Sequence, residues 1–186
     1  MTYNFIRCIG IFFFCNICFS TLGQGPLKRE KITDKISMMI PSDFIAMVES
    51  ERNRKYLSTK EPIALYTNND RTVDLGINET NSLWSTGDLA ILKDFYKANI
   101  LSLYTEVAFI QEELIEIDGR SFIAFEFNSK VVDDRGLGKP IAKYTYILYT
   151  IREERVLLFN FSAPFRYRQA WQPVARDMMN SIRIKK

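Results

Sequence analysis

The dipeptide Asp118-Gly119 separates two long apolar segments, and it constrains the fold more than any other feature of the sequence. Asp-Gly strongly favours a two-residue type I′ turn, because both residues of that turn need φ > 0. The flanking segments, 107–117 and 120–131, have the apolar and aromatic content of strands. The sequence therefore predicts a long antiparallel β-hairpin centred on this turn. A second long hairpin is expected to follow it and to end near Ser162.

A hairpin centred on this turn predicts which residues face each other across the two strands. Apolar residues should then meet in three pairs, which are Leu114–Ile123, Ile115–Phe122 and Ile110–Phe127. The same register sets Glu112 opposite Phe125, a mismatch that a β-bulge within 111–114 would relieve. One extra residue reverses the alternation of side chains between the two faces.

The N-terminal segment has the layout of a secretory signal peptide. Arg7 precedes an apolar run of about 12 residues, 8–19, and small and polar residues follow as far as Gly25. That run is shorter than the roughly 20 residues that span a bilayer, so a permanent transmembrane helix is not expected. Thr21 and Gly23 fit the small-x-small cleavage rule, which predicts a signal peptide over 1–23. An uncleaved anchor and a lipoprotein are the alternatives.

The inventory of reactive residues excludes several kinds of site. The three cysteines, Cys8, Cys15 and Cys18, lie in the predicted signal peptide, and the chain has no histidine. The mature chain would therefore lack a thiol nucleophile, a disulfide, a Cys/His zinc site and a Ser-His or Cys-His couple. We expect no catalytic residue, no metal and no cofactor. Lysine and arginine are scattered along the chain, so no nucleic-acid partner is expected.

Residues 24–186 are expected to form one α+β domain, because a chain of this length buries about 70% of its unfolded surface. Beyond the hairpins, strands are predicted over 32–40, 62–67 and 72–78, and 182–186 is expected to add a short terminal strand. Helices are predicted over 44–54, 89–104 and 167–181. Pro173 should set the start of the last helix near Trp171 or Gln172, because proline has no amide hydrogen to donate and is tolerated without cost only in the first turn of a helix. The remaining segments, 24–31, 79–87 and 133–139, are expected to be an exposed lead-in and two loops.

The predicted helix over 89–104 should pack on a sheet through one apolar stripe, leaving Lys93, Asp94 and Lys97 outside. The residues of this stripe have the spacing i, i+3, i+4, i+7 and are Leu92, Phe95, Tyr96, Asn99, Ile100 and Leu103.

Three aromatic residues are candidates for contact with a ligand or a partner. Tyr144 and Tyr146 share one face of a predicted strand. If that face is buried away from water, their hydroxyl groups need hydrogen-bond partners within the protein. Trp84 is expected in the polar loop before the long helix, where it would be exposed. The alternative for all three is packing within the core or at its edge, which aromatic residues on strands commonly do.

Four carboxylates on the first hairpin, Glu112, Glu113, Glu116 and Glu126, are the candidates for chemistry without histidine, such as glycoside hydrolysis. In the predicted register Glu113 faces Ala124 and Glu126 faces Gln111, so no two acids meet across the strands. We interpret these acids as exposed residues that keep the strands soluble.

Four segments, taken in order, resemble landmarks of the PsbP-like superfamily, which includes the Ran-release factors of Mog type. They are SMMIPSDF, DLAILKDFYKANI, IDGRSFIAFEF and WQPVARDMMNSIRI, and the resemblance covers 32–186. The chain also resembles small exported bacterial members of this group. The resemblance implies an α/β/α sandwich, with a central antiparallel sheet of about six to seven strands flanked by helices.

The resemblance also implies an accessory or binding protein, since known members include photosystem subunits, periplasmic lipoproteins and chaperones. We therefore expect a non-enzymatic module in the periplasm or outside the cell, envelope-associated or free, with no integral span after signal cleavage. Its partner would be a protein or an apolar ligand, bound at a concave apolar patch near Tyr144, Tyr146 and Trp84. A carboxylate-dependent hydrolase and a structural envelope protein are the alternatives.

Overall fold

The computed structural model describes residues 24–55, 61–132 and 139–185. The predicted signal peptide, all three cysteines and most of the predicted loop over 133–139 lie outside these residues.

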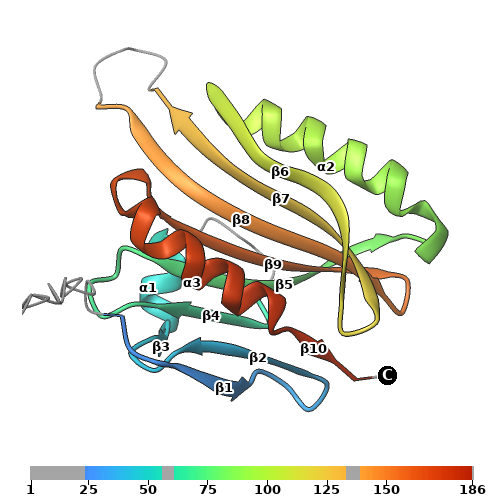
Figure 1. Ribbon diagram of the computed structural model, residues 1–186, viewed down its shortest axis with the longest axis horizontal. Coiled ribbons are helices and arrows are strands. Elements are labelled where there is room, and N and C mark those ends of the chain that lie inside the picture. Colours follow the sequence, from blue (N-terminus) through green and yellow to red (C-terminus); the bar gives the residue numbers. More distant parts are fainter. Residues whose placement is uncertain (1–23, 56–60, 133–138, 186) are drawn as a thin grey trace, which may run out of the picture.

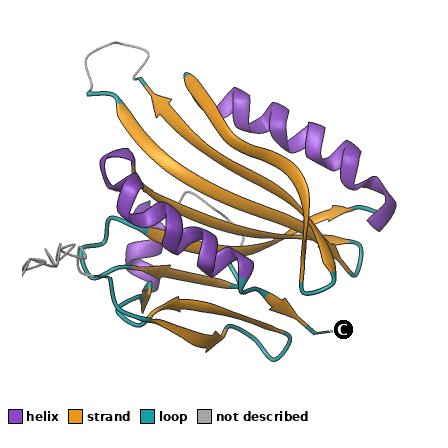
Figure 2. Ribbon diagram, viewed as in Figure 1, coloured by secondary structure: helices purple, strands orange, loops and turns teal. Residues whose placement is uncertain are grey.

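A seven-stranded antiparallel sheet forms the centre of the molecule (Figures 1 and 2). Its strand order is β3-β4-β5-β9-β8-β7-β6. The strands are β3 (Ile45–Ala46), β4 (Ala64–Thr67), β5 (Asp74–Leu83), β6 (Glu106–Ile117), β7 (Arg120–Val131), β8 (Ile141–Arg152) and β9 (Arg155–Pro164). The two long hairpins, β6–β7 and β8–β9, therefore make up more than half of the sheet, as the sequence predicts.

A second sheet of three strands, which the sequence did not predict, lies beside the first (Figure 1). It consists of β1 (Leu27–Lys31), β2 (Ile36–Pro41) and the terminal strand β10 (Arg183–Ile184), in the order β1-β2-β10. The expected lead-in over 24–31 is thus wrong, because β1 pairs along its whole length with β2. The prediction of a short terminal strand is confirmed.

Helices cover both faces of the large sheet. They are α1 (Glu49–Lys55), α2 (Leu89–Leu103) and α3 (Arg168–Asn180), with 3₁₀ turns η1 (Thr86–Asp88) and η2 (Phe165–Tyr167) before the last two. The core on one face contains the apolar residues of α3, and the core on the opposite face contains those of α2. This arrangement confirms the α+β class and the helix-flanked antiparallel sheet.

The core under α3 joins the two sheets. Trp171, Ala175 and Met178 of α3 pack there with Phe159 and Phe161 of β9, and β2 contributes three more buried apolar side chains, Ile36, Met38 and Ile40. The core under α2 is smaller. There Leu92 and Ile100 pack on Ile123 and Phe125, and the ring of Tyr96 stacks on that of Tyr149 with centroids 3.9 Å apart. Both faces of β7 and β8 are therefore buried.

The Asp118-Gly119 turn has the predicted geometry, with φ of 52° and 73° at its two residues. Two predicted cross-strand pairs, Leu114–Ile123 and Ile115–Phe122, are confirmed, and Glu112 does face Phe125.

The predicted position of the bulge is wrong. The register shifts between Phe109 and Gln111, so Phe127 faces Phe109 instead of Ile110. The shift sends Phe109 into the core under α2 while Ile110 packs at the core under α3. The need to bury both side chains on opposite faces explains the bulge at this place.

Three other element boundaries differ from the prediction. The first helix begins at Glu49, because Ile45 and Ala46 pair with β4 as a short strand. The segment expected as a loop over 79–87 instead continues β5 as far as Leu83. Pro173 lies inside α3, which begins five residues earlier at Arg168. The tertiary packing of Trp171, Ala175 and Met178 outweighs the local cost of the proline.

Within residues 24–55, 61–132 and 139–185, every helix is too short or too polar to cross a bilayer.

The left-handed turn makes Gly119 a test of the fold. We expect Gly119→Ala to lower the free energy of unfolding by about 1 kcal/mol, because a Cβ disfavours φ of +73° even where space is open. Urea denaturation followed by circular dichroism measures the change. Gly87→Ala is the matched control, since Gly87 has ordinary φ and its added Cβ would only touch Ser85 at 3.8 Å. Equal effects of the two substitutions would contradict the turn geometry.

Candidate functional site

Tyr144 and Tyr146 lie under α3 and are closed to solvent, with 0% and 2% of their surface exposed. The hydroxyl of Tyr144 donates a hydrogen bond to Oε1 of Glu126 at 3.0 Å. Burial raises the pKa of Tyr144, and it raises the pKa of Tyr146 to about 12. Both residues thus belong to the core under α3.

Trp84 lies on the opposite face of the sheet, at the edge of the core under α2. Its ring is 5.9 Å from that of Phe95 on α2. The structure therefore separates Trp84 from the two tyrosines, and the three do not line a common apolar patch. Tyr146 does reach a groove between β6 and α3, but the lining of that groove includes Glu113, Glu116 and Arg176.

A buried polar cluster of four residues explains why Tyr144 tolerates its position. Glu126 of β7 is fully buried and accepts hydrogen bonds from Tyr144, from Gln172, and from Nε and Nη2 of Arg176 at 3.0 and 2.9 Å. Gln172 and Arg176 lie four residues apart on α3, so both reach the same carboxylate. The cluster attaches α3 to the sheet. The interpretation of Glu126 as an exposed, solubilising acid is therefore wrong.

Glu112 also has a structural role. Its carboxylate forms ion pairs with Lys93 at 3.1 Å and Lys97 at 2.8 Å, so these two lysines turn toward β6 and not outward as predicted. The hydrogen bond from Lys97, followed by that from Lys93, holds the pKa of Glu112 below its usual range. Glu113 and Glu116 are exposed. Of the four candidate carboxylates, two are thus occupied by cations.

The packed stripe of α2 is narrower than predicted, and a second apolar stripe faces outward. Leu92 and Ile100 are buried, whereas Phe95 and Leu103, which were expected in the packed stripe, are 49% and 69% exposed. Ile91 and Leu101 lie with Phe95 on the outer face, at 63% and 49% exposure. We call Leu83, Trp84, Ile91, Phe95 and Leu101 the α2 surface. The spacing 91, 95, 98 and 101 was a visible signal for it, since Ala98 completes an apolar run on a face expected to be polar.

A cavity of about 370 Å³ lies over β4, β5 and β9, and we call it the β5 cavity. Its polar lining residues come mainly from one face of β5 and β9. The residues around it are Arg52, Pro62, Leu65, Asp74, Gly76, Asn78, Glu79, Thr80, Asn160 and Ser162. In the sequence, Asp74, Gly76 and Asn78 alternate with Val73, Leu75 and Ile77, a pattern typical of a strand with one solvent-exposed face. The sequence alone did not show that β9 lies next to this face and extends it.

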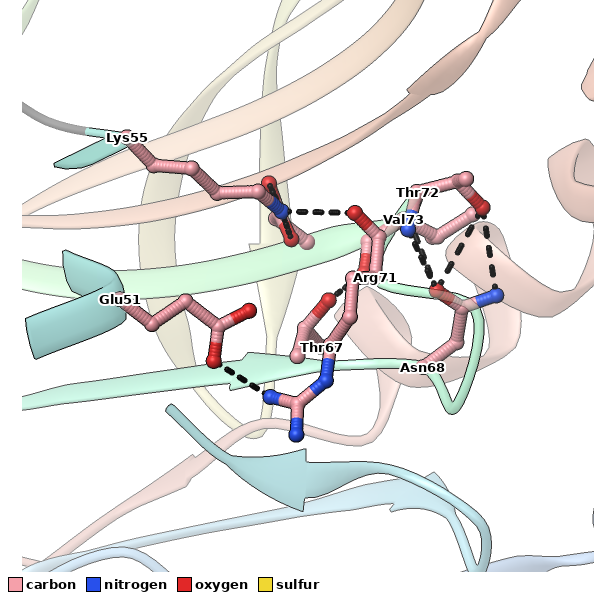
Figure 3. A network of polar contacts seen from close by, with 8 residues as sticks. Glu51, Lys55, Thr67, Asn68, Arg71, Thr72 and Val73 are labelled. Carbon is pink, nitrogen blue, oxygen red and sulfur yellow. Dashed lines mark hydrogen bonds and ion pairs between the residues drawn. The ribbon is translucent and has the colours of Figure 1, made fainter. Parts of the chain in front are cut away.

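A polar network that includes Asp74 of the cavity lining joins α1 to the β4–β5 turn (Figure 3). Lys55 donates to both carboxylate oxygens of Asp74, at 2.8 and 3.0 Å, and to the carbonyl oxygen of Arg71 at 2.9 Å. Arg71 in turn pairs with Glu51 of α1. Inside the turn, Oδ1 of Asn68 accepts hydrogen bonds from the amides of Thr72 and Val73. Asp74, which lines the cavity, is therefore held by an ion pair with α1.

Within the part of the chain that the structure describes, no three side chains of the types His, Cys, Asp and Glu lie close enough together to hold a metal ion.

Comparison with known proteins gives the fold but no sequence relative. No family model and no curated protein matches the sequence. Among solved structures, cyanobacterial PsbP (CyanoP) from Synechocystis has a TM-score of 0.61 at 14% identity, over 88% of this chain and 95% of that chain. The Ran-binding protein Mog1p from Saccharomyces cerevisiae has a TM-score of 0.58 at 12% identity, over 86% and 96%. A protein from Bacteroides thetaiotaomicron has a TM-score of 0.50 at 14% identity, over 88% of this chain and 49% of that longer one.

The Glu126 cluster predicts that Arg176 is needed for stability. We expect Arg176→Met to lower the free energy of unfolding by about 2 kcal/mol, because the buried Glu126 carboxylate would be left without its cation. The value is below the 3–5 kcal/mol of a fully buried pair, since 47% of the Arg176 side chain is exposed. Chemical denaturation measures the loss, and Arg183→Met on the exposed end of β10 should have little effect.

The double variant Glu126→Gln/Arg176→Met tests the cause of that loss. It should recover most of the stability, because a neutral amide keeps an acceptor for the Tyr144 hydroxyl and leaves no unpaired buried charge. A double variant as unstable as Arg176→Met alone would show that the cluster acts in another way.

The ion pairs of Glu112 predict a pH dependence. Because the pKa of Glu112 is lowered in the folded state, its contribution is present above the ordinary glutamate pKa of 4.5 and is lost as pH falls through the lowered pKa. We expect Glu112→Gln to cost up to about 1 kcal/mol at pH 7 and nearly nothing at acid pH. Denaturation at both pH values measures this, with Glu116→Gln as the control of equal charge change. A cost that is the same at both pH values would contradict the ion-pair account.

Proposed function

The chain has the fold of the PsbP-like superfamily that includes Mog1, and on this premise we propose that it is a non-enzymatic accessory module that binds a protein partner through the α2 surface. The observation that carries this proposal is the exposure of Ile91, Phe95 and Leu101 on the outer face of a helix that is already packed on its inner face.

The α2 surface has the composition of a protein interface. Large apolar and aromatic side chains gathered on one exposed face mark interaction sites, whereas scattered ones do not. Phe95 and Trp84 lie side by side, with ring centroids 5.9 Å apart, and aromatic residues are the usual anchors of protein interfaces. The sequence-based choice of Trp84 as a contact residue fits this surface.

The charges around the α2 surface indicate the chemistry of the partner. Asp94 is exposed on α2, whereas Lys93 and Lys97 pair with Glu112. Glu154, also exposed, lies next to Trp84, whose amide donates to the Glu154 carbonyl oxygen at 2.8 Å. The exposed Arg155, which faces Leu83, donates to Asn81. We infer a partner whose contact surface has an apolar centre and a basic rim on the side of Asp94 and Glu154.

Three further arguments support the proposal. Mog1p, which shares the fold, is a Ran-binding protein, so this fold is compatible with binding a protein. The ion pairs of Glu112 and Glu126 favour a structural role for these carboxylates over a catalytic one. The predicted signal peptide over 1–23 favours a place in the periplasm or outside the cell, and we propose that the partner is met there.

Site-specific photo-crosslinking tests this proposal. A photoreactive phenylalanine analogue is placed at Phe95 in the full chain and, as a control, at Gln169, an exposed position of α3 on the opposite face. We expect one discrete protein adduct from position 95 in cells that export the chain, and none from position 169.

Two substitutions make the outcome specific. Ile91→Ser should remove the adduct at position 95, because it takes away the adjacent apolar contact, while thermal stability stays within about 0.5 kcal/mol of wild type as for other surface changes. Asp94→Lys should weaken the adduct by repelling a basic rim. The proposal would be wrong if the adduct from position 95 still forms in both variants, or if the only crosslink is between two copies of this chain.

A further inference from the structure

The β5 cavity combines a ligand-sized volume with polar side chains that make no hydrogen bond to any residue the structure describes. We propose that it binds a small neutral ligand that presents hydrogen-bond donors and acceptors side by side, as the hydroxyls of a sugar or the amide of a blocked peptide unit do. This site is separate from the α2 surface, because its lining comes from α1, β5, β9 and the segment that includes Pro62 and β4.

The volume of the cavity suits a small ligand. About 370 Å³ lies within the range of roughly 300–1,000 Å³ that small-molecule sites occupy. The absence of a side chain at Gly76 helps to create this space. A Cβ there would come within 3.1 Å of Leu65 and 3.6 Å of the Asn78 side-chain amide nitrogen. Any larger residue at this position would therefore press against these two lining side chains.

The charged side chains at the cavity already have partners of opposite charge. Asp74 is paired with Lys55 at 2.8 Å and Glu79 with Arg152 at 3.0 Å. Arg52 is paired with Glu61 at 3.1 Å. Because these pairs cancel each other, the lining formed by residues that the structure describes has no excess charge of either sign. A charged ligand would have to break one of these pairs, whereas a neutral ligand leaves them intact.

The uncharged polar side chains, by contrast, have hydrogen-bond donors and acceptors that are available to a ligand. The side chains of Asn78, Asn160 and Ser162 form no hydrogen bond with any other residue that the structure describes. Oδ1 of Asn160 is in addition buried without a partner. Buried acceptors without a partner are rare and costly, so a donor from a ligand would be favourable here.

The types of these groups indicate the ligand. Each asparagine amide offers two donors and one acceptor, and the serine hydroxyl both donates and accepts. Asn160 and Asn78 come from adjacent strands, since β5 pairs with β9 and Gly76 faces Asn160. Leu65 and Pro62 add an apolar side to the lining. A neutral molecule with alternating donors and acceptors and some C–H surface matches this lining.

The cavity is also held in shape before any ligand arrives. Asn160 and Ser162 alternate with Phe159 and Phe161, whose side chains are fully buried in the core on the other face of β9. The Lys55–Asp74 and Arg71–Glu51 pairs hold α1 against the β4–β5 turn (Figure 3). The binding of a ligand therefore does not have to order these side chains, and the smaller loss of conformational entropy favours affinity.

Nuclear magnetic resonance of the full chain, labelled with ¹⁵N-asparagine, tests the inference. Glucose and N-acetylglycine N-methylamide are the two neutral probes, and they distinguish a sugar from an amide ligand. Glucuronate tests the role of charge. We expect at least one neutral probe to shift the side-chain amide signals of Asn78 and Asn160 in a saturable way, with a dissociation constant of about 1 mM or tighter.

Three variants control the result. Asn160→Leu, which keeps the size of the side chain, should weaken binding at least tenfold, an expectation set by the loss of one well-placed hydrogen bond in a desolvated site. Ser162→Ala should weaken it less, and it guards against a folding defect in the first variant. Asn180→Ala, on the exposed end of α3, should leave binding unchanged. Thermal unfolding confirms that each variant is folded.

Three outcomes would overturn the inference. One is the absence of any shift at Asn78 and Asn160 with both neutral probes at roughly 50 mM, far above the expected dissociation constant. Another is glucuronate binding more than tenfold tighter than glucose, which would make the cavity an anion site. The third is unchanged binding in Asn160→Leu. None of these bears on the α2 surface, so the protein-binding proposal stands or falls separately.

Discussion

The burial of both faces of β7 and β8 is the constraint on which the rest of the structure depends. Phe122 and Ala124 point into the core under α3, while Ile123 and Phe125 point into the core under α2. Strands with apolar residues on both faces cannot leave either face to water, so the sheet needs a helical layer on each side. The attachment of α3 is strengthened by the Glu126 cluster and that of α2 by the ion pairs of Glu112.

The two helical layers are unequal, and both proposed binding places follow from this. The core on the face opposite α3 is built on β7 and β8 with the start of β9, so the same face of β5 and the rest of β9 carries Asp74, Gly76, Asn78, Asn160 and Ser162 around a cavity. The helix α2 also has more apolar residues than one packing face can use, which leaves Ile91 and Phe95 exposed. The β5 cavity lies on the part of this face that the core under α2 does not include, and the α2 surface is the outer side of the same helix.

Local chemistry made much of the fold predictable. The Asp-Gly dipeptide predicts a left-handed turn, and that turn determines the pairing of Leu114 with Ile123 without any knowledge of the rest of the chain. The bulge at Ile110 was not predictable in the same way, because it depends on which core receives Phe109. The place of Pro173 inside α3 likewise depends on the packing of Trp171 in the core, and this tertiary contact cannot be predicted from helix propensities.

The candidate sites were harder to predict, for a physical reason. Glu126 lies in the apolar run FIAFEF on the same strand face as Phe122, which was a signal that it points inward, but its partner Arg176 is 50 residues away. Asn160 alternates with buried phenylalanines, yet its role depends on the pairing of β9 with β5. Each site depends on contacts between distant segments, and these appear only when the sheet order is known.

The most direct test of the account is hydrogen–deuterium exchange of the full chain, alone and after crosslinking through position 95 to the partner proposed for the α2 surface. The account predicts that binding slows exchange in the peptides covering 83–103, which hold the α2 surface. Peptides of α3 and of the Glu126 cluster should keep their rates, because they only support the scaffold. Protection confined to α3 or to the three-stranded sheet, with α2 unchanged, would contradict it.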